Sequence, residues 1–373
     1  MTTARFLDAL ALRLPIVQGP MTGSDTPALA AAVSAAGGLG MLGCGMRSPA
    51  AMAEAAAEVR RRTDRPFGLN LFVQETPAPD AATVDAALAR LAPLYAEFGL
   101  QPAVPARWCE DFAAQFDALL AARPAVASFT FGILSAEQVE RLHRAGCYVI
   151  GTATTVAEAL AWEGVGADAV CASGMEAGGH RGTFLQQGGH REDGAARGAL
   201  SQDDFTASLV GTMALVPQCV DALRIPVIAA GGIMDGRGIA AAQALGAQAV
   251  QMGTAFLACP ESAIGPAYRA ALAQATAADT RVTRVYSGRP ARGIVNTMLE
   301  RLAPDEAAIP PYPVQNALTG ALRRAAAEQG RADHLSLWAG QGVAAARPLP
   351  AGELVALLAQ EWQAALKSIA ASA

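Results

Sequence analysis

The chain has 373 residues, of which 52% are hydrophobic but only 5% aromatic, and its formal net charge is −5 at pH 7. This length suits one large barrel with insertions or two ordinary domains, and the apolar content excludes a disordered chain. An acidic chain without an extended basic patch argues against nucleic acid as a partner.

The use of cysteine, lysine and histidine narrows the possible chemistry. The six cysteines are scattered without a C-x-x-C pair, which indicates reduced thiols in a cytosolic protein. Lys367 is the one lysine of the chain, so no strand can offer the buried lysine of a Schiff-base enzyme. The four histidines show neither H-x-H nor H-E-x-x-H spacing, and we expect no metal site.

Neither a signal peptide nor a membrane span is expected. Arg5, Asp8 and Arg13 interrupt the apolar residues of the N-terminus. No uncharged apolar run reaches the roughly 18 residues needed to cross a bilayer. The sequence therefore predicts a soluble, cytoplasmic protein.

Short apolar runs alternate with helical patterns from the N-terminus onward, which is typical of βα units and a parallel sheet. Helices are expected at 50–62, 136–145 and 156–166. The first strand is followed by Pro20-Met21-Thr22-Gly23, which is no dinucleotide-binding fingerprint. We therefore predict the α/β class, as a (β/α)8 TIM barrel, with strands at 16–21, 39–43, 67–73, 127–132, 148–152, 169–173, 227–231 and 249–253.

Three connections exceed an ordinary βα loop. Residues 78–123 should carry two helices, and residues 174–204 form a long, polar, glycine-rich loop. Residues 257–349 contain helical pieces, and the amphipathic run 351–369 should be the eighth barrel helix. These lengths predict a barrel of residues 1–257 and 350–373, with a mostly helical, substrate-side segment inserted at 258–349.

The strongest local signal for a ligand follows the seventh strand, where Gly231 and Gly232 precede a helix that Asp235 should cap. Glycines let the backbone approach an anion, and a helix N-terminus directs N–H groups towards it. Barrels commonly bind phosphate with the loops after strands seven and eight. We expect a phosphate site here, helped by Arg237 and by four residues at the end of the eighth strand: Gln251, Met252, Gly253 and Thr254. The alternative is that these glycines only permit tight turns.

A histidine in the glycine-rich loop after strand six is the candidate for the reacting residue. His180 follows Gly178 and Gly179 at the end of the barrel where catalytic residues belong, and histidine can exchange a proton near neutral pH. Cys171 is the competitor, but a thiol within an apolar strand should be inert. The remaining histidines receive no role: His190 in a polar stretch, His143 on an outer helix and His334 in the insertion.

The chain resembles the nitronate monooxygenases, formerly called 2-nitropropane dioxygenases. The most specific string is Glu-Ala-Gly-Gly-His-Arg-Gly at 176–182. The resemblance also rests on Gln-Gly-Pro-Met at 18–21, Gly-Leu-Asn-Leu-Phe at 68–72, Ala-Gly-Gly-Ile at 230–233, Gln-Met-Gly-Thr at 251–254, Ser-Gly-Arg-Pro-Ala-Arg at 287–292 and Trp-Ala-Gly-Gln-Gly at 338–342.

This resemblance implies noncovalently bound FMN and the oxidation of an alkyl nitronate by dioxygen to a carbonyl compound and nitrite. It implies that Met21 and Asn70 contact the isoalloxazine side and that Gly178 lines the flavin. The phosphate end then falls to Gly232 and residues 251–254, and His180 is the catalytic histidine. Ser173 stands where other members carry a glutamine, and because a serine reaches less far, the flavin contact at this position is expected to be lost or replaced by water. Tyr312 is a candidate for one of the tyrosines that shape the substrate pocket in some members.

We expect His180 to orient the nitronate by a hydrogen bond, or by charge if protonated, or to take the α-proton of a neutral nitroalkane. Two alternatives stay open. One is an FMN-dependent reductase that uses NAD(P)H and acts on enoyl-acyl-carrier-protein or quinone. The other is a non-catalytic barrel that binds flavin or phosphate.

Overall fold

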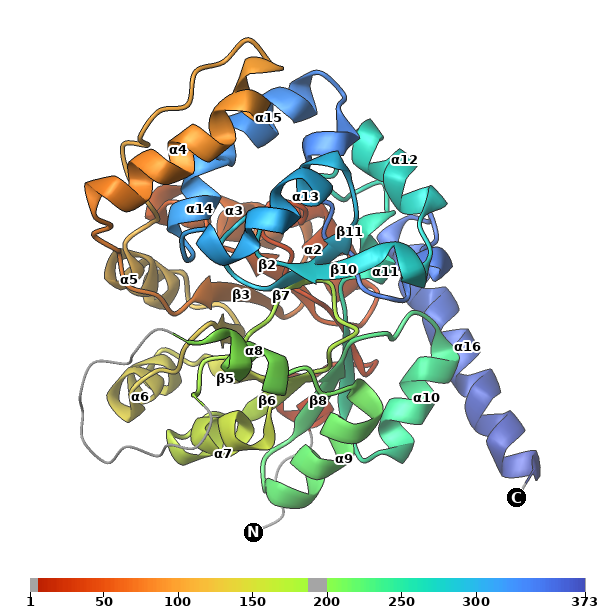
Figure 1. Cartoon of the computed structure of the whole chain (residues 1–373). Helices are drawn as coiled ribbons and strands as arrows, with labels where there is room; N and C mark the ends of the chain where they lie inside the picture. The colour runs from red at the N-terminus through yellow and green to blue at the C-terminus, as the bar shows by residue number, and fades with distance from the viewer. Residues whose placement is uncertain (1–5, 187–199, 373) are drawn as a thin grey trace.

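The computed structural model describes residues 6–186 and 200–372, in which eight parallel strands form a barrel inside a ring of helices (Figure 1). The neighbours follow the order β1-β9-β8-β6-β5-β4-β3-β2, and a parallel bridge between Val17 and Leu39 closes the ring. The strands are β1 (Ile16–Gln18), β2 (Gly40–Gly43), β3 (Phe67–Phe72), β4 (Val126–Thr130), β5 (Tyr148–Ala153), β6 (Ala169–Ser173), β8 (Val227–Ala230) and β9 (Ala249–Met252). The predicted (β/α)8 fold is confirmed.

Most of the eight strands end earlier than the sequence predicts. The predicted ends near Met21, Gly231 and Gly253 lie outside the ladder and line a pocket. At these residues the backbone leaves the sheet, because the chain bends across the open end of the barrel. Apolar character alone does not distinguish a strand residue from the buried loop residue that follows it.

The helices that surround the barrel pack closely because their inner faces are largely Ala, Val and Leu. Thr26, Ser48 and Ser135 cap three of them through side-chain oxygens. The ring comprises α2 (Pro27–Ala35), α3 (Pro49–Arg62), α5 (Phe112–Ala122), α6 (Ala136–Arg144), α7 (Val156–Gly164), α9 (Thr212–Ala222), α10 (Gly236–Ala244) and α16 (Ala351–Ser372), and the short α1 (Phe6–Ala9) precedes β1. The final helix packs against α2 and α10, as expected for the eighth barrel helix.

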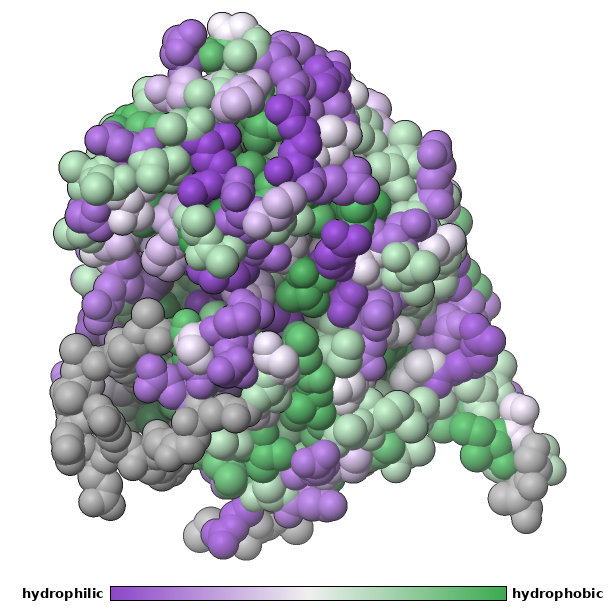
Figure 2. Space-filling view, viewed as in Figure 1, coloured by the Kyte–Doolittle hydropathy of each residue, from purple (hydrophilic) through white to green (hydrophobic). Residues whose placement is uncertain are grey.

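A second apolar core lies above the barrel, in the upper part of Figure 1. It joins the long segment between β9 and α16 to α4 (Ala81–Ala96), which comes from the β3–α5 connection. The long segment contains α11 (Thr254–Leu257), α12 (Pro266–Gln274), β10 (Thr280–Thr283), β11 (Ala291–Ile294), α13 (Thr297–Leu302), α14 (Val314–Leu318), α15 (Gly320–Glu328) and the 3-10 turns η1 (Ala277–Asp279), η2 (Ala303–Ala308), η3 (Ala332–His334) and η4 (Val343–Ala345). Hydrophilic residues cover much of this region on the face seen in Figure 2, so its helices turn their apolar sides inward.

The loop after β6 differs from the expected irregular loop. Residues 179 and 180 form β7 (Gly179–His180), which pairs antiparallel with β11, and β11 pairs with β10. His180 lies opposite Ala291 in this small sheet. Its backbone is therefore fixed by the long segment after β9 as well as by the barrel.

Two expectations for the stretch after β6 remain, one for His190 and one for the end of the long loop. His190 lies outside the described residues, while α8 (Gln202–Ala207) begins within the stretch expected to be a loop. Among the helices in the described part of the chain, none is long and apolar enough to cross a membrane.

Candidate active site

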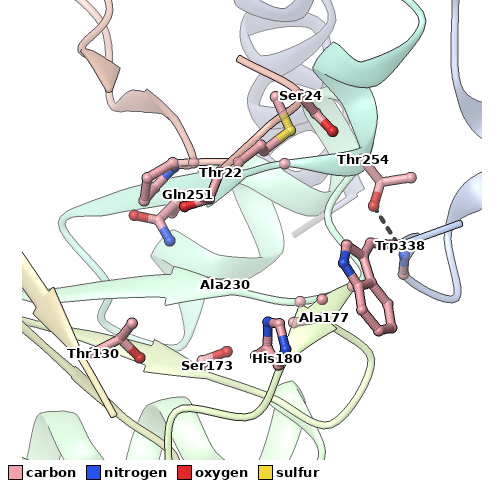
Figure 3. A pocket seen from close by; sticks show the side chains of 18 of the residues that line it. Thr22, Ser24, Thr130, Ser173, Ala177, His180, Ala230, Gln251, Thr254 and Trp338 are labelled. Carbon is pink, nitrogen blue, oxygen red and sulfur yellow. Dashed lines mark hydrogen bonds between the residues drawn. The ribbon is translucent and has the colours of Figure 1, made fainter. Parts of the chain in front are cut away.

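A pocket lies between the carboxyl ends of the barrel strands and the segment above them (Figure 3). Strands, loops and distant helices all contribute side chains to it. Apart from Arg237, the structure brings the residues that the sequence marked for catalysis or cofactor binding to this one pocket: Met21, Asn70, Ser173, Gly178, His180, Gly231, Gly232, Gln251, Met252, Gly253 and Thr254.

Backbone amides form the floor of the pocket beyond β8 and β9. Gly231 has a φ of 114°, and a Cβ there would lie 2.8 Å from Thr212 Oγ1. The described residues include no acceptor for the N–H groups of Gly231, Gly232 and Gly253. Such free, convergent amides suit a phosphate without a basic side chain.

The N-terminus of α10 does not supply these amides. Asp235 caps the helix as predicted, and its carboxylate accepts hydrogen bonds from Arg237 N and Gly238 N. Gly236 N donates to Glu361 at 3.1 Å. The anion site therefore belongs to the glycine loop that precedes the helix. Arg237 was expected to help there, but its side chain is exposed, pairs with Asp235 and lies outside the pocket.

Polar side chains hold the opposite rim of the pocket in place. Met21 N donates to Asp25 Oδ2 at 2.7 Å, and Gly43 N donates to the same oxygen at 2.7 Å. Burial raises the pKa of Asp25 to about 6, against the effect of these bonds and of Arg47. Asn70 Nδ2 donates to Ser128 Oγ at 2.9 Å, so its carbonyl oxygen is left for the pocket.

His180 lies within hydrogen-bond distance of one side chain, with 2.8 Å between its Nε2 and Ser287 Oγ. The Ser287 hydroxyl can donate to Arg289 O at 3.2 Å, and we therefore assign the proton of the neutral His180 ring to Nε2, which donates to Ser287 and leaves a lone pair on Nδ1. Desolvation, with Arg289 and Arg323 nearby, lowers the pKa of His180 to about 3. The imidazole is therefore neutral, which argues against the charged form that the sequence left open.

Aromatic rings enclose His180 on several sides. Trp338 and Phe131 lie 5.2 Å and 5.4 Å from its ring, and Tyr312 lies 5.6 Å away. In Figure 3, Trp338 stands beside His180, and Thr254 accepts a hydrogen bond from Gly340 N at 2.9 Å. The rings exclude water and leave an apolar space for a small organic molecule.

Phe131 occupies this wall in a strained conformation. Its φ is 76°, unusual for a bulky residue, and its ring stacks on Phe72 with 4.3 Å between centroids. The Arg289 guanidinium lies 4.1 Å from the centre of the Phe131 ring. Strain of this kind costs about 1–3 kcal/mol and tends to occur at functional sites.

Several lining residues were missed by sequence reasoning, among them Arg323, Asn316, Tyr268 and Phe131. One signal was available for Arg323. In α15 the apolar residues Leu322 and Ala326 define the buried helix face, and the charged residue at position 323 lies beside that face.

The rejected candidates lie away from the pocket. Cys171 is buried in β6, where burial raises the pKa of its thiol to about 12. His143 lies on α6 and pairs with Asp168 at 2.9 Å. His334 is buried in η3 against Phe98.

Comparisons with known proteins agree with this geometry. Residues 4–361 match the family model described as nitronate monooxygenase. A nitronate monooxygenase of Pseudomonas aeruginosa is 46% identical over 96% of this chain and 99% of its own length. The crystal structure of nitroalkane oxidase from Streptomyces ansochromogenes has a TM-score of 0.86 at 42% identity, covering 97% of this chain and 99% of that one. FabK from Thermotoga maritima has a TM-score of 0.74 at 30% identity, with 98% of each chain covered.

Proposed function

Because this chain belongs to the nitronate monooxygenase family, we propose that it uses FMN and dioxygen to oxidise an alkyl nitronate to a carbonyl compound and nitrite. The observation that carries the proposal is the position of a neutral histidine in an aromatic pocket whose floor is a cradle of free amides. A binding protein without activity would not need His180 in such surroundings.

The residues of the pocket fit a flavin phosphate. The glycine amides after β8 and β9 would hold the phosphate, and Thr254 Oγ1 can still donate its own proton after accepting from Gly340. Met21, Asn70, Ser173 and Gly178 would border the ring system, as the resemblance implies. Bound FMN supplies the one-electron oxidation of the substrate and the reaction with dioxygen.

We assign two tasks to His180. Its Nδ1 lone pair can take the α-proton when a neutral nitroalkane enters, because Ser287 keeps the ring proton on Nε2. Its ring also forms one wall against the substrate, between Trp338 and Phe131. This step requires the neutral imidazole, since a protonated imidazole could not accept the proton.

We propose that the barrel of residues 1–257 and 350–373 carries the flavin, whereas residues 258–349 cover the substrate. The supporting observation is that Tyr312, Asn316, Arg323 and Trp338, all from the second segment, line the pocket. The packing of α4 against the same segment adds one helix of the first part to this cover.

Anaerobic mixing of the FMN-loaded protein with propyl-2-nitronate tests the proposal. The visible flavin spectrum should change at once, and admission of oxygen should release acetone and nitrite. A flavin spectrum that ignores the nitronate but is bleached by NADH would replace the proposal with the reductase alternative. A protein that cannot be loaded with FMN would remove it.

A further inference from the structure

Arg323 is the one lysine or arginine among the described residues that line the pocket. It projects from α15 into the region where Tyr312, Asn316 and Trp338 also lie. Burial lowers its pKa to about 10, so the guanidinium stays charged at pH 7. A fixed positive charge thus stands among the substrate-side residues of the pocket. Glu176, the one carboxylate among the described lining residues, lies instead beside the glycine loop, where it accepts hydrogen bonds from Thr212 N and Oγ1.

No carboxylate neutralises this charge within the described residues. The guanidinium donates to Ser336 Oγ at 3.3 Å and to Asn316 O and Oδ1 at 2.9 Å and 2.8 Å. Its Nε–H is buried without a partner, and it takes part in no described ion pair within 4.0 Å. Leaving a buried charge unpaired is costly, which points to a ligand that completes the site.

Other buried arginines near the site differ in this respect. Arg181 and Arg289 feel the charge of Glu158, and Arg292 feels that of Glu176. No carboxylate acts on Arg323 in this way, because its charged or ionisable neighbours are Tyr312, Arg324, Tyr95 and Tyr286. The guanidinium charge is therefore not neutralised by a neighbouring acid of the described chain.

Asn316 is oriented by the same contact. Because Arg323 can only donate, the amide oxygen of Asn316 must face it, and the Nδ2 donors turn the other way. Nδ2 makes a weak contact with Met46 Sδ, at 4.0 Å. Asn316 lines the pocket, so its amide can offer an N–H to a ligand there.

His180 cannot do this work. With Nε2–H donated to Ser287, its Nδ1 is an acceptor and repels an anion. An anionic nitronate therefore needs donors and positive charge from another part of the wall.

We propose that Arg323 and Asn316 form a seat for the anionic substrate, holding the oxygens of the nitronate while its carbon faces the cofactor. This inference rests on the proposed function for the identity of the anion. It assigns substrate binding to Arg323 and Asn316 and proton transfer to His180.

Isobutyrate is a suitable probe, because its carboxylate has the shape and charge of propyl-2-nitronate but cannot be oxidised in the same way. Isobutyramide is the matched neutral probe. Each is titrated into the FMN-loaded protein, and binding is followed by the perturbation of the flavin spectrum. In Arg323→Met we expect the Kd for isobutyrate to rise about tenfold or more, whereas that for isobutyramide changes by less than about threefold.

Two further variants sharpen the test. Asn316→Asp should weaken isobutyrate to a similar degree, because the new carboxylate pairs with Arg323, and it serves if Arg323→Met does not fold. Arg324→Met is the control, since Arg324 is exposed and lies outside the pocket-lining set. In Arg323→Met and Asn316→Asp, the KM for propyl-2-nitronate should rise together with the Kd for isobutyrate.

Unchanged isobutyrate binding in both Arg323→Met and Asn316→Asp would overturn the proposal. So would an equal loss of isobutyrate and isobutyramide, which indicates a general collapse of the pocket. If the charge-dependent pattern holds but the wild-type protein does not oxidise nitronates, the seat stands and the proposed function fails.

Discussion

The floor and the cover of the pocket are built in different ways. The floor consists of short runs of consecutive residues, such as 231–232 and 253–254, whose backbone amides are its chemistry. The cover consists of side chains from separate elements of residues 258–349, including Tyr312, Arg323 and Trp338. A ligand phosphate would meet backbone N–H groups on the floor, beside a Glu176 carboxylate whose oxygens accept from Thr212, whereas a substrate would meet rings and a full positive charge.

This difference implies that cofactor binding by the floor tolerates substitution better than substrate handling by the cover does. Backbone amides stay available under most substitutions, as long as the residue fits the turn. A side-chain wall changes its character with a single replacement. We therefore expect floor variants to alter cofactor affinity and cover variants to alter substrate handling, and the following variants test that separation.

The largest effect should come from His180→Asn. Loss of the base should lower turnover of neutral 2-nitropropane by about a hundredfold or more, while the Kd for FMN is unchanged. The measurement pairs steady-state nitrite release with FMN titration. His143→Asn on α6 is the control, and full activity of His180→Asn would refute the assigned role.

Gly231→Ala should act on the floor. The left-handed φ and the close Thr212 hydroxyl would force the loop to shift, with strain of about 1–3 kcal/mol, so FMN affinity should fall by up to about a hundredfold. Equilibrium FMN titration measures this. Gly146→Ala is the matched control, because Gly146 has a φ of 82° with open space around it. An equal loss of FMN affinity in both variants would contradict the amide cradle.

Thr254→Val is a milder change on the floor. It removes the acceptor for Gly340 N and the hydroxyl donor of the pocket, and FMN affinity should fall about tenfold. Thr254→Ser retains the hydroxyl and should bind FMN within about twofold of the wild type. If the valine variant binds as tightly as the serine variant, the hydroxyl does not contribute.

The smallest expected change concerns the titration of His180, which should not be seen in the folded protein near neutral pH. Because folding lowers the pKa of His180, its ring should stay neutral between about pH 8 and pH 5, and its NMR signals should not move in that range. The unfolded chain gains a proton there below about pH 6.5, so this residue contributes a loss of stability as pH falls. The signals are assigned by comparison with His180→Asn. A midpoint near pH 6.5 would show that the imidazole is not desolvated.

The floor of the pocket could be predicted from local sequence patterns. The cover could not, because its residues are far apart in the sequence. Gly231 and Gly232 could be interpreted because strand, glycine turn and helix cap follow one another directly. The helix pattern could mark Arg323 as a charge beside a buried face, but nothing local says that this face meets the barrel mouth. The contribution of α4 to the second core was missed for the same reason. The prediction that N–H groups at the start of α10 are free for the anion was wrong, because the Asp235 carboxylate accepts their hydrogen bonds.

The pairing of β7 with β11 also sets a rule for transplanting this site. His180 sits opposite Ala291, and Arg181 N donates to Pro290 O at 2.8 Å, so two stretches more than a hundred residues apart jointly fix the height of the imidazole. A loop graft that moved only the Glu-Ala-Gly-Gly-His-Arg-Gly string into another barrel would bring the histidine without its support. Chimeras between relatives should therefore exchange both strands as one unit, with Ser287 included so that the ring keeps its tautomer.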